Sequence, residues 1–134
     1  MRIAIFSEVY WPMVSGVGVT LDRLVSALQD RGHEVRVYSA SYAIPEGEAE
    51  RPEAHRSPSV PLFLYPDVQW AFPRQQEIVD DLARFRPDVV HVATEFAMGL
   101  AGIKAAGQLG LPVIASAHTD YVKYAARYGV RWVL

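Results

Sequence analysis

The stretch "RIAIFSEVYWPMVSGVGVTLDRLVSALQDRGHEVRVYSA" (Arg2–Ala40) decides the fold of this chain. Its first residues, Arg2–Phe6, form a short β-branched and aromatic run that predicts a buried strand. Gly18 to Arg31 then has helical spacing and ends at Gly32, where a C-capping glycine is preferred. The helix face comprises Leu21, Leu24, Val25 and Leu28. With a second strand at Glu34–Ser39, the pattern predicts a parallel strand pair joined by a right-handed helical crossover.

The rest of the chain continues this alternation of strands and helices. We expect an exposed loop at Ser41–Val60, a weaker strand at Val60–Pro66, a helix at Arg74–Phe85, a strand at Pro87–Ala93, a helix at Phe96–Leu109 and a strand at Leu111–His118. Nearly continuous apolar strands are typical of a parallel sheet covered on both faces. The sequence therefore predicts one open, doubly wound α/β domain, in which ligands bind outside the carboxyl ends of the strands. The segments expected there are Ser7–Gly18, Ser39–Tyr42, Ala93–Ala97 and Ala117–Tyr121.

Composition excludes several classes of function. The 134 residues are 51% hydrophobic, carry a formal net charge of -2 and include no cysteine. Disulfides, thiolate metal sites and cysteine nucleophiles are therefore excluded, and a cytoplasmic location is consistent. The charge gives no overall attraction to nucleic acid, and no stretch approaches the roughly 18 apolar residues of a membrane span.

No histidines are paired at ligand spacing, so we expect no metal. We expect His91 in a strand, His33 at a helix end and His55 in the exposed loop to be structural.

Gly16-Val17-Gly18 precedes the first helical face and is a candidate phosphate site. A helix N-terminus presents unpaired N–H groups, and glycines allow a phosphate to approach the backbone closely. The spacing is not G-x-G-x-x-G, because Leu21 stands at the third position, and no P-loop Gly-Lys-Ser/Thr follows. From the residues alone, a phosphate cradle and a flexible turn stay equally open.

The ends of the other strands argue against two common ligand classes. A dinucleotide site places an acidic residue after the second strand, where this chain has Ser39-Ala40-Ser41. A phosphoacceptor receiver domain needs acidic residues after several strands. Glu8 could supply one of them, but no Asp follows the runs "VPLFLY" and "VVHVA" in a convincing place, so this interpretation is also disfavoured.

Three polar residues follow the later strands. His118 lies at the expected ligand edge, where an imidazole can bond to sugar hydroxyls, and we favour that role over a structural one. For Asp120 the simpler interpretation is a helix N-cap. Glu95 can bind a hydroxyl or act as a base, but it also favours the start of the next helix, which is the slightly preferred interpretation.

The chain ends in a pattern that does not resemble a terminus. Lys123, Arg127 and Arg131 lie four residues apart and would share one helix face. This face could meet a phosphate or an anionic membrane, but a solvated face or an interface with missing chain is the preferred interpretation. The last residues are apolar and uncapped up to Leu134. We therefore expect the N-terminal part of a longer protein, and a stop codon directly after Leu134 would refute this.

Three segments together carry a family resemblance: Arg2–Ala40, "PSVPLFLYPDVQWAFP" (Pro58–Pro73) and "RPDVVHVATEFAMGLAGIKAAGQLGLPVIASAHTDY" (Arg86–Tyr121). In this order and spacing they resemble the N-terminal domain of the family 4, or group 1, retaining glycosyltransferases. Within this family the chain resembles the bacterial α-mannosyltransferase and sulfoquinovosyltransferase branch that builds glycolipids. The resemblance implies the Rossmann-like N-terminal half of a GT-B fold, facing a C-terminal donor-binding domain that this chain lacks.

The resemblance also implies an activity and roles for residues. The activity is metal-independent hexosyl transfer, with retention, from a nucleotide-diphosphate sugar such as GDP-mannose or a UDP-sugar to an acceptor such as a glycolipid. No cofactor is implied, and the fragment alone would be inactive. Gly16, Val17 and Gly18 would approach the donor diphosphate, and His118 would contact the donor sugar as the catalytic residue. The residues implied in acceptor or sugar binding are Tyr10, Glu95, Asp120, Tyr121 and Lys123.

The implied partners are the nucleotide sugar, the acceptor and the missing C-terminal domain. A peripheral contact with the inner face of a membrane stays open. Two alternatives also stay open: a non-catalytic binding module of the same fold, and a sugar-nucleotide epimerase of GT-B fold.

Overall fold

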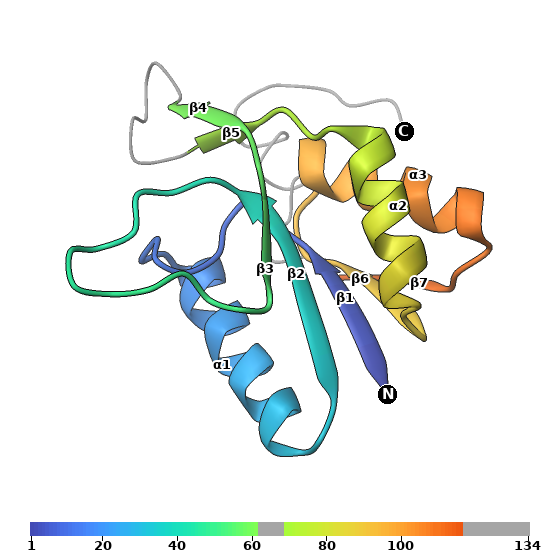
Figure 1. Cartoon of the computed structure of the whole chain (residues 1–134), viewed down its shortest axis with the longest axis horizontal. Helices are drawn as coiled ribbons and strands as arrows, with labels where there is room; N and C mark the ends of the chain where they lie inside the picture. Colours follow the sequence, from blue (N-terminus) through green and yellow to red (C-terminus); the bar gives the residue numbers. More distant parts are fainter. Residues whose placement is uncertain (62–68, 117–134) are drawn as a thin grey trace, which may run out of the picture.

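A computed structural model describes residues 1–61 and 69–116 of the chain. The elements are β1 (Arg2–Phe6), α1 (Gly16–Asp30), β2 (Glu34–Ala40), β3 (Ala54–Ser57), β4 (Ser59–Pro61), β5 (Gln69–Ala71), α2 (Gln75–Phe85), β6 (Val89–Val92), α3 (Ala97–Leu109) and β7 (Val113–Ala115), as Figure 1 shows. The three helices predicted within the described residues are present, as are the predicted strands at β1, β2, β6 and β7. The final helix, predicted to begin near Asp120, lies outside the described residues.

The described strands build a five-stranded sheet in the order β3-β2-β1-β6-β7, and every pair in it is parallel. The central strand β1 pairs with β2 on one side and with β6 on the other, so that Ile3 lies opposite both Val35 and Val89. The strand order reverses between β1 and β6, which makes this the topological switch point of the sheet. The predicted doubly wound parallel α/β fold is confirmed.

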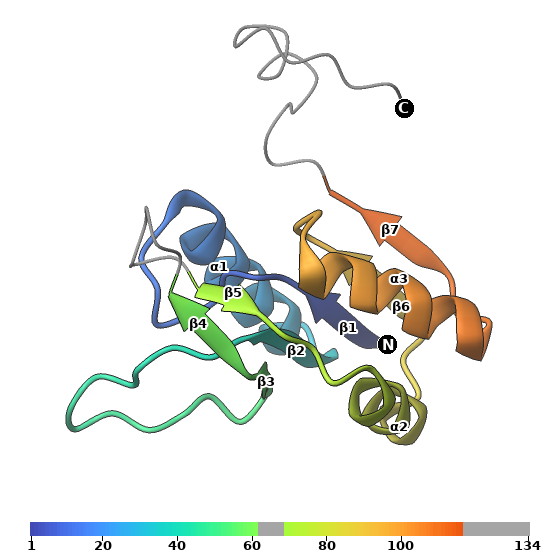
Figure 2. The same cartoon turned by 90° about the horizontal axis from the view of Figure 1, so that it is seen from above.

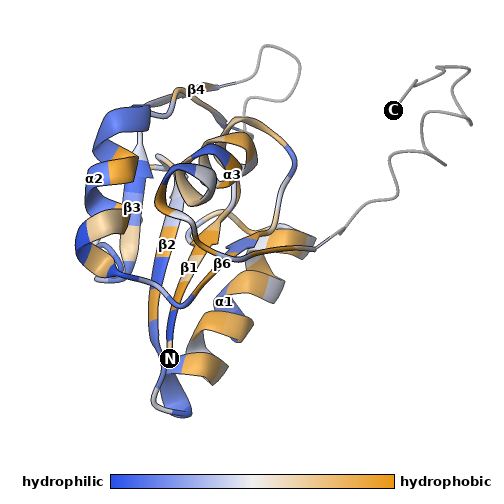
Figure 3. Cartoon of the chain, turned by 90° about the vertical axis from the view of Figure 1, so that its right-hand side faces the viewer, coloured by the Kyte–Doolittle hydropathy of each residue, from blue (hydrophilic) through white to orange (hydrophobic). Residues whose placement is uncertain are grey.

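The two faces of the sheet bury different helices (Figures 1 and 2). Because successive side chains of a strand alternate, β1 directs Ile3 and Ile5 toward α1, and Ala4 and Phe6 toward α2 and α3. The core residues on the helices are Leu21 and Val25 in α1, Ile78 and Leu82 in α2, and Met98, Ala101 and Ala105 in α3. Hydrophobic residues accordingly gather on the central strands, while α2 is largely hydrophilic on its outer side (Figure 3).

The helix ends follow local chemistry. Helix α1 begins two residues earlier than its apolar spacing predicts, because Ser15 is the N-cap and accepts from the Gly18 N–H. It is followed by Gly32 at φ 86°, and α3 is followed by Gly110 at φ 67°. Both values lie in the left-handed region that glycine adopts without strain, which is why these helices end where the sequence predicts.

The prediction of an exposed loop at Ser41–Val60 is wrong in part. Residues Ala54–Ser57 form β3, which pairs in parallel with β2, and His55 therefore lies in a strand with its ring 5.2 Å from that of Tyr38. The third strand of the main sheet is thus β3, and not the run at Val60–Pro66. Of that run the structure describes only the start, where β4 pairs antiparallel with β5. The short edge strand "AHRS" has no apolar pattern that the sequence could reveal. It is held in the sheet by its backbone pairing with β2.

Candidate functional site

The carboxyl ends of β1, β2 and β6 meet at one edge of the sheet. The first turns of α1 and α3 and the β4–β5 hairpin lie at this same end of the molecule (Figure 1). In open α/β sheets ligands bind in this crevice, beside the switch point. The carboxyl edge therefore contains the candidate site.

The first turn of α1 offers two backbone donors at this edge. Ser15 Oγ accepts the Gly18 N–H at 3.1 Å, whereas no described residue accepts the N–H groups of Gly16 and Val17. The first turn contains no acidic side chain, and Gly16 is exposed. Unpaired amides at the positive end of a helix dipole favour an anion. The predicted diphosphate contact stays a prediction, and the available amides are those of Gly16 and Val17.

Gly16 and Gly18 differ in what surrounds them. A Cβ at Gly18 would lie 2.6 Å from the Met13 carbonyl oxygen and 3.2 Å from Val9 Cγ1, whereas a Cβ at Gly16 would meet no atom within 4 Å. Gly18 is therefore required for the close approach of the β1–α1 loop to the helix. The space above Gly16 is open.

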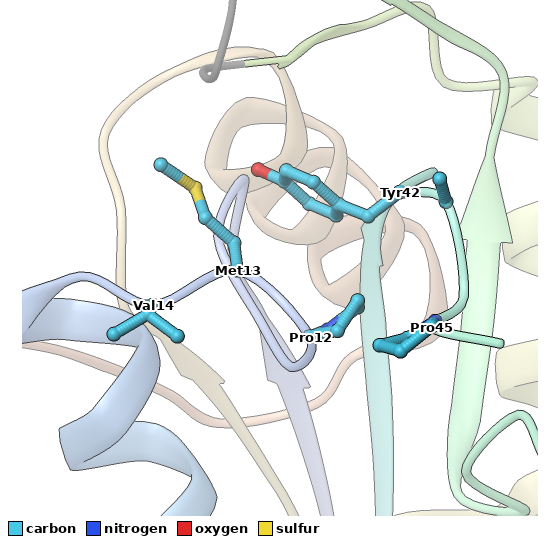
Figure 4. Close-up of a pocket in the computed structure, with 6 residues that line it drawn as sticks. Pro12, Met13, Val14, Tyr42 and Pro45 are labelled. Carbon is cyan, nitrogen blue, oxygen red and sulfur yellow. The ribbon is translucent and has the colours of Figure 1, made fainter. Parts of the chain in front are cut away.

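A pocket of about 350 Å³ lies between the loops that follow β1 and β2. It is lined by Pro12, Met13, Val14, Tyr42, Ala43 and Pro45 (Figure 4). The Tyr42 hydroxyl donates to the Glu8 carbonyl oxygen at 2.9 Å. Burial and the nearby Glu8 charge raise the pKa of Tyr42 to about 12, so this hydroxyl stays protonated at neutral pH. The pocket thus has a wall from each loop, with one tyrosine fixed in place.

Two arginines hold these two loops together. Arg51 pairs with Asp22 of α1 at 2.9 Å, and its guanidinium lies 4.5 Å from the Trp11 ring centroid. Arg56 of β3 pairs with Glu50 and donates to the Trp11 carbonyl oxygen. Cation–π and bidentate contacts suit the planar guanidinium, so these arginines fasten the loop after β2 onto the loop after β1.

Tyr10 is fully buried in the core beside α1. Its hydroxyl donates to Glu53 Oε1 at 2.6 Å, and the Arg56 guanidinium lies 5.6 Å from its ring centroid. Burial and the Glu53 carboxylate raise the pKa of Tyr10. The structure therefore gives Tyr10 an internal role, and its predicted contact with an acceptor stays a prediction.

Glu95 is exposed and stands just before Phe96, the N-cap position of α3. Within residues 1–61 and 69–116, nothing bonds to its carboxylate. The side chain is thus accessible at the carboxyl edge, and both of its predicted roles, hydroxyl binding and support of the helix start, stay open.

Glu8 is a residue of this edge that the sequence did not single out for this site. It is 3% exposed, and its Oε1 accepts the Met98 N–H in the first turn of α3 at 2.6 Å. Burial raises the pKa of Glu8, although the backbone bonds from Met98 and Ala71 oppose that change. The available signal was an acidic residue two positions after a buried strand.

Several predicted residues lie outside the described part of the chain. They are His118, Asp120, Tyr121 and Lys123, together with Arg127 and Arg131. Among the described residues, no group of three or more His, Asp and Glu side chains could hold a metal ion. None of the described helices is both long and apolar enough to cross a membrane.

Comparison with known proteins identifies the family. A family model described as Glycosyltransferase Family 4 matches residues 14–134. The chain is 35% identical to an alpha-monoglucosyldiacylglycerol synthase of Streptococcus pneumoniae, over 95% of this chain and 29% of that protein. It is 34% identical to a GDP-mannose-dependent alpha-mannosyltransferase of Mycolicibacterium smegmatis, over 97% of this chain and 36% of that protein. It is 29% identical to the sulfoquinovosyl transferase SQD2 of Arabidopsis thaliana, over 99% of this chain and 26% of that protein. The chain thus spans about a third or less of the length of these relatives, and it belongs to glycosyltransferase family 4.

Proposed function

We propose that the protein carrying this chain is a retaining hexosyltransferase that uses a nucleotide-diphosphate sugar. The observation that carries this proposal is the pair of amides, Gly16 and Val17, for which residues 1–61 and 69–116 offer no acceptor, at the switch-point edge of a family 4 chain. In this proposal the chain forms the acceptor side of a cleft and one wall of the donor phosphate site. A second domain, facing this edge, supplies the rest.

The chemistry needs the kind of groups that this edge offers. A glycosyl donor departs as a nucleoside diphosphate, whose negative charge grows in the transition state. Fixed N–H dipoles aimed at that charge lower the barrier, and loss of one such donor in other enzymes slows turnover by about 10²–10³-fold. Retention by attack on the same face of the sugar, assisted by the leaving phosphate, requires no enzymic nucleophile and no metal.

The acceptor proposal is supported by what the relatives are called. One relative is named for diacylglycerol glycosylation and another for GDP-mannose. We therefore propose GDP-mannose or a UDP-sugar as donor and a glycolipid as acceptor, in a cytoplasmic protein that contacts the membrane peripherally. His118 would contact the donor sugar, while Glu95, Asp120, Tyr121 and Lys123 would contact the acceptor.

The pocket beside Tyr42 is the described cavity that best fits acceptor binding. It opens at the same edge as the Gly16 and Val17 amides, and both of its walls belong to loops that follow parallel strands. Because residues 1–134 span about a third of the relatives' length, we propose that they do not turn over substrate alone.

The test is a donor screen on the full-length protein with lipid extracts as acceptors. We expect a lipid-soluble product that carries one hexose, release of a nucleoside diphosphate, and the donor's own anomeric configuration in the new linkage by NMR. A sugar nucleotide converted to its epimer without transfer would identify an epimerase. Binding of donor or lipid without any product would identify a binding module, and either outcome would refute the proposal.

A further inference from the structure

Glu8 lies at a junction of four segments of the candidate site: the ends of β2 and β6, the strand β5 and the first turn of α3. Its carboxylate accepts the Met98 N–H of α3 at 2.6 Å and the Ala71 N–H of β5 at 3.4 Å. No described lysine, arginine or histidine pairs with it. Two backbone amides and the N-terminal end of α3 are therefore what compensates this buried charge.

The peptide groups of Glu8 reach the remaining strand ends. Its N–H donates to Thr94 Oγ1, beyond β6, at 2.9 Å. Its carbonyl oxygen accepts the Tyr42 hydroxyl, beyond β2, at 2.9 Å, and Ser39 Oγ lies 3.5 Å from the same oxygen. Glu8 alone thus bonds to the ends of β2 and β6, to β5 of the hairpin and to α3.

Glu8 is also linked to the proposed phosphate amides through the chain itself. Val9, its neighbour, stands against the first turn of α1, since a Cβ at Gly18 would lie 3.2 Å from Val9 Cγ1. The Val9 N–H is in turn fixed by Ser7 Oγ at 3.1 Å. A displacement of Glu8 would therefore be transmitted to the start of α1 and, through Tyr42, to the wall of the pocket.

A carboxyl group is costly to bury at this position. Burial raises the pKa of Glu8, which means that folding disfavours its charged form relative to its neutral form. An apolar side chain would leave the Met98 and Ala71 N–H groups without this acceptor, and an amide would place an oxygen against only one of them. A carboxylate accepts through both oxygens, so it can join α3 to β5 at this position.

We infer that Glu8 is a positioning residue of the proposed transferase, which holds the loops after β1, β2 and β6 and the start of α3 in one arrangement. This inference deepens the proposed function and rests on it for its kinetic consequence. Glu8 itself is buried, so it acts through the Tyr42 wall and the first turn of α1 rather than by touching substrate.

The test compares Glu8→Gln and Glu8→Asp with Asp81→Asn in the full-length protein. Asp81 is a matched control, because it is also a buried carboxylate, 8% exposed, but it bonds to Arg36 and Tyr38 between α2 and β2. Glu8→Gln keeps an oxygen for the Met98 N–H and directs an NH₂ group at the Ala71 N–H. Glu8→Asp keeps the charge but draws the carboxylate back by one methylene.

Two measurements are made on each variant. Hydrogen exchange is followed in the segments 9–15, 39–43 and 93–99, and kcat and KM are measured with GDP-mannose or UDP-glucose, whichever donor the protein uses. We expect Glu8→Gln to speed exchange in all three segments and to lower kcat/KM about tenfold, with Glu8→Asp intermediate in both. Asp81→Asn should lower the melting temperature without either effect.

Two results would overturn the inference. One is faster exchange in Glu8→Gln confined to the Ala71 and Met98 amides; the other is a loss of kcat/KM no larger than that of Asp81→Asn. If Glu8→Gln does not fold, Glu8→Asp decides by the same two criteria. If the wild-type protein uses no nucleotide sugar, the proposed function fails. The hydrogen exchange of Glu8→Gln in the three segments still decides whether Glu8 positions them.

Discussion

Gly18→Ala and Gly16→Ala form a matched pair, because the two glycines share one helical turn but have different surroundings. At Gly18 the new Cβ would lie 2.6 Å from the Met13 carbonyl oxygen, which belongs to the backbone and cannot rotate away. At Gly16 it would meet no atom within 4 Å. The same chemical change should therefore have opposite effects on stability.

The magnitudes follow from two opposing terms. Overpacking at a tight site costs about 1–3 kcal/mol, whereas replacing glycine by alanine inside a helix gains about 1 kcal/mol. For Gly18→Ala the contact at 2.6 Å is with a backbone oxygen, which places the cost in the upper part of this range, at about 2–3 kcal/mol. The net change is then a loss of about 1–2 kcal/mol. Gly16→Ala should be neutral or stabilising by about 0.4–1 kcal/mol, since it only restricts the unfolded chain.

Thermal and urea unfolding of both variants measure this difference. At about 4 °C per kcal/mol for a domain of this size, Gly18→Ala should melt about 4–8 °C below wild type, and Gly16→Ala at or slightly above it. Equal midpoints for the two variants, or a loss at Gly16 alone, would refute the packing difference between the two glycines.

Three further predictions concern turnover and pH. Gly16→Val should leave the fold intact, because the space is open, but slow turnover about 10²-fold in a steady-state assay if the donor phosphate approaches there; near-normal rates would remove that role. His118→Ala should reduce transfer more than it reduces nucleoside diphosphate binding measured by calorimetry, and an unchanged rate would return His118 to a structural role. Burial raises the pKa of Asp81, but the bonds from Tyr38 and Arg36 outweigh it, so the pKa of Asp81 lies below its usual value. Its stabilising contribution is then present above the unfolded-state pKa and lost as pH falls through the folded one. The stability gap between wild type and Asp81→Asn should consequently shrink as the pH falls below the ordinary pKa of an aspartate, and a constant gap in urea titrations would contradict this.

The sequence predicts those elements that carry their own pattern. The strand β1 and the helix α1 are visible because their apolar residues have clear periods and because Gly32 marks the helix end. The strand β3 is not visible, since three of its four residues are polar and they become a strand only through pairing with β2. The alternation of apolar strands and helices along the chain thus predicts the parallel sheet. The existence of the edge strand β3 depends on its pairing with β2, which the sequence does not display.

The candidate site divides in the same way. The place of Gly16 and Val17 at a helix start could be predicted, because a helix start is local in sequence. Their contact with a donor phosphate stays a prediction. The contacts of Glu8 with Met98 and of Tyr10 with Glu53 join residues 90 and 43 positions apart. Nothing local in the sequence indicates that Glu8 is the junction of the site or that Tyr10 is closed off from the surface.

The most direct test of the proposed donor contact is hydrogen exchange on the millisecond scale in the full-length protein. It would be measured on the peptide that spans Trp11 to Leu21, with and without saturating GDP or UDP. Because no described residue accepts the Gly16 and Val17 N–H groups, we expect these two amides to exchange fast alone and clearly more slowly with the bound nucleotide. Protection elsewhere in the protein, with this peptide unchanged, would show that the first turn of α1 does not hold the donor phosphates.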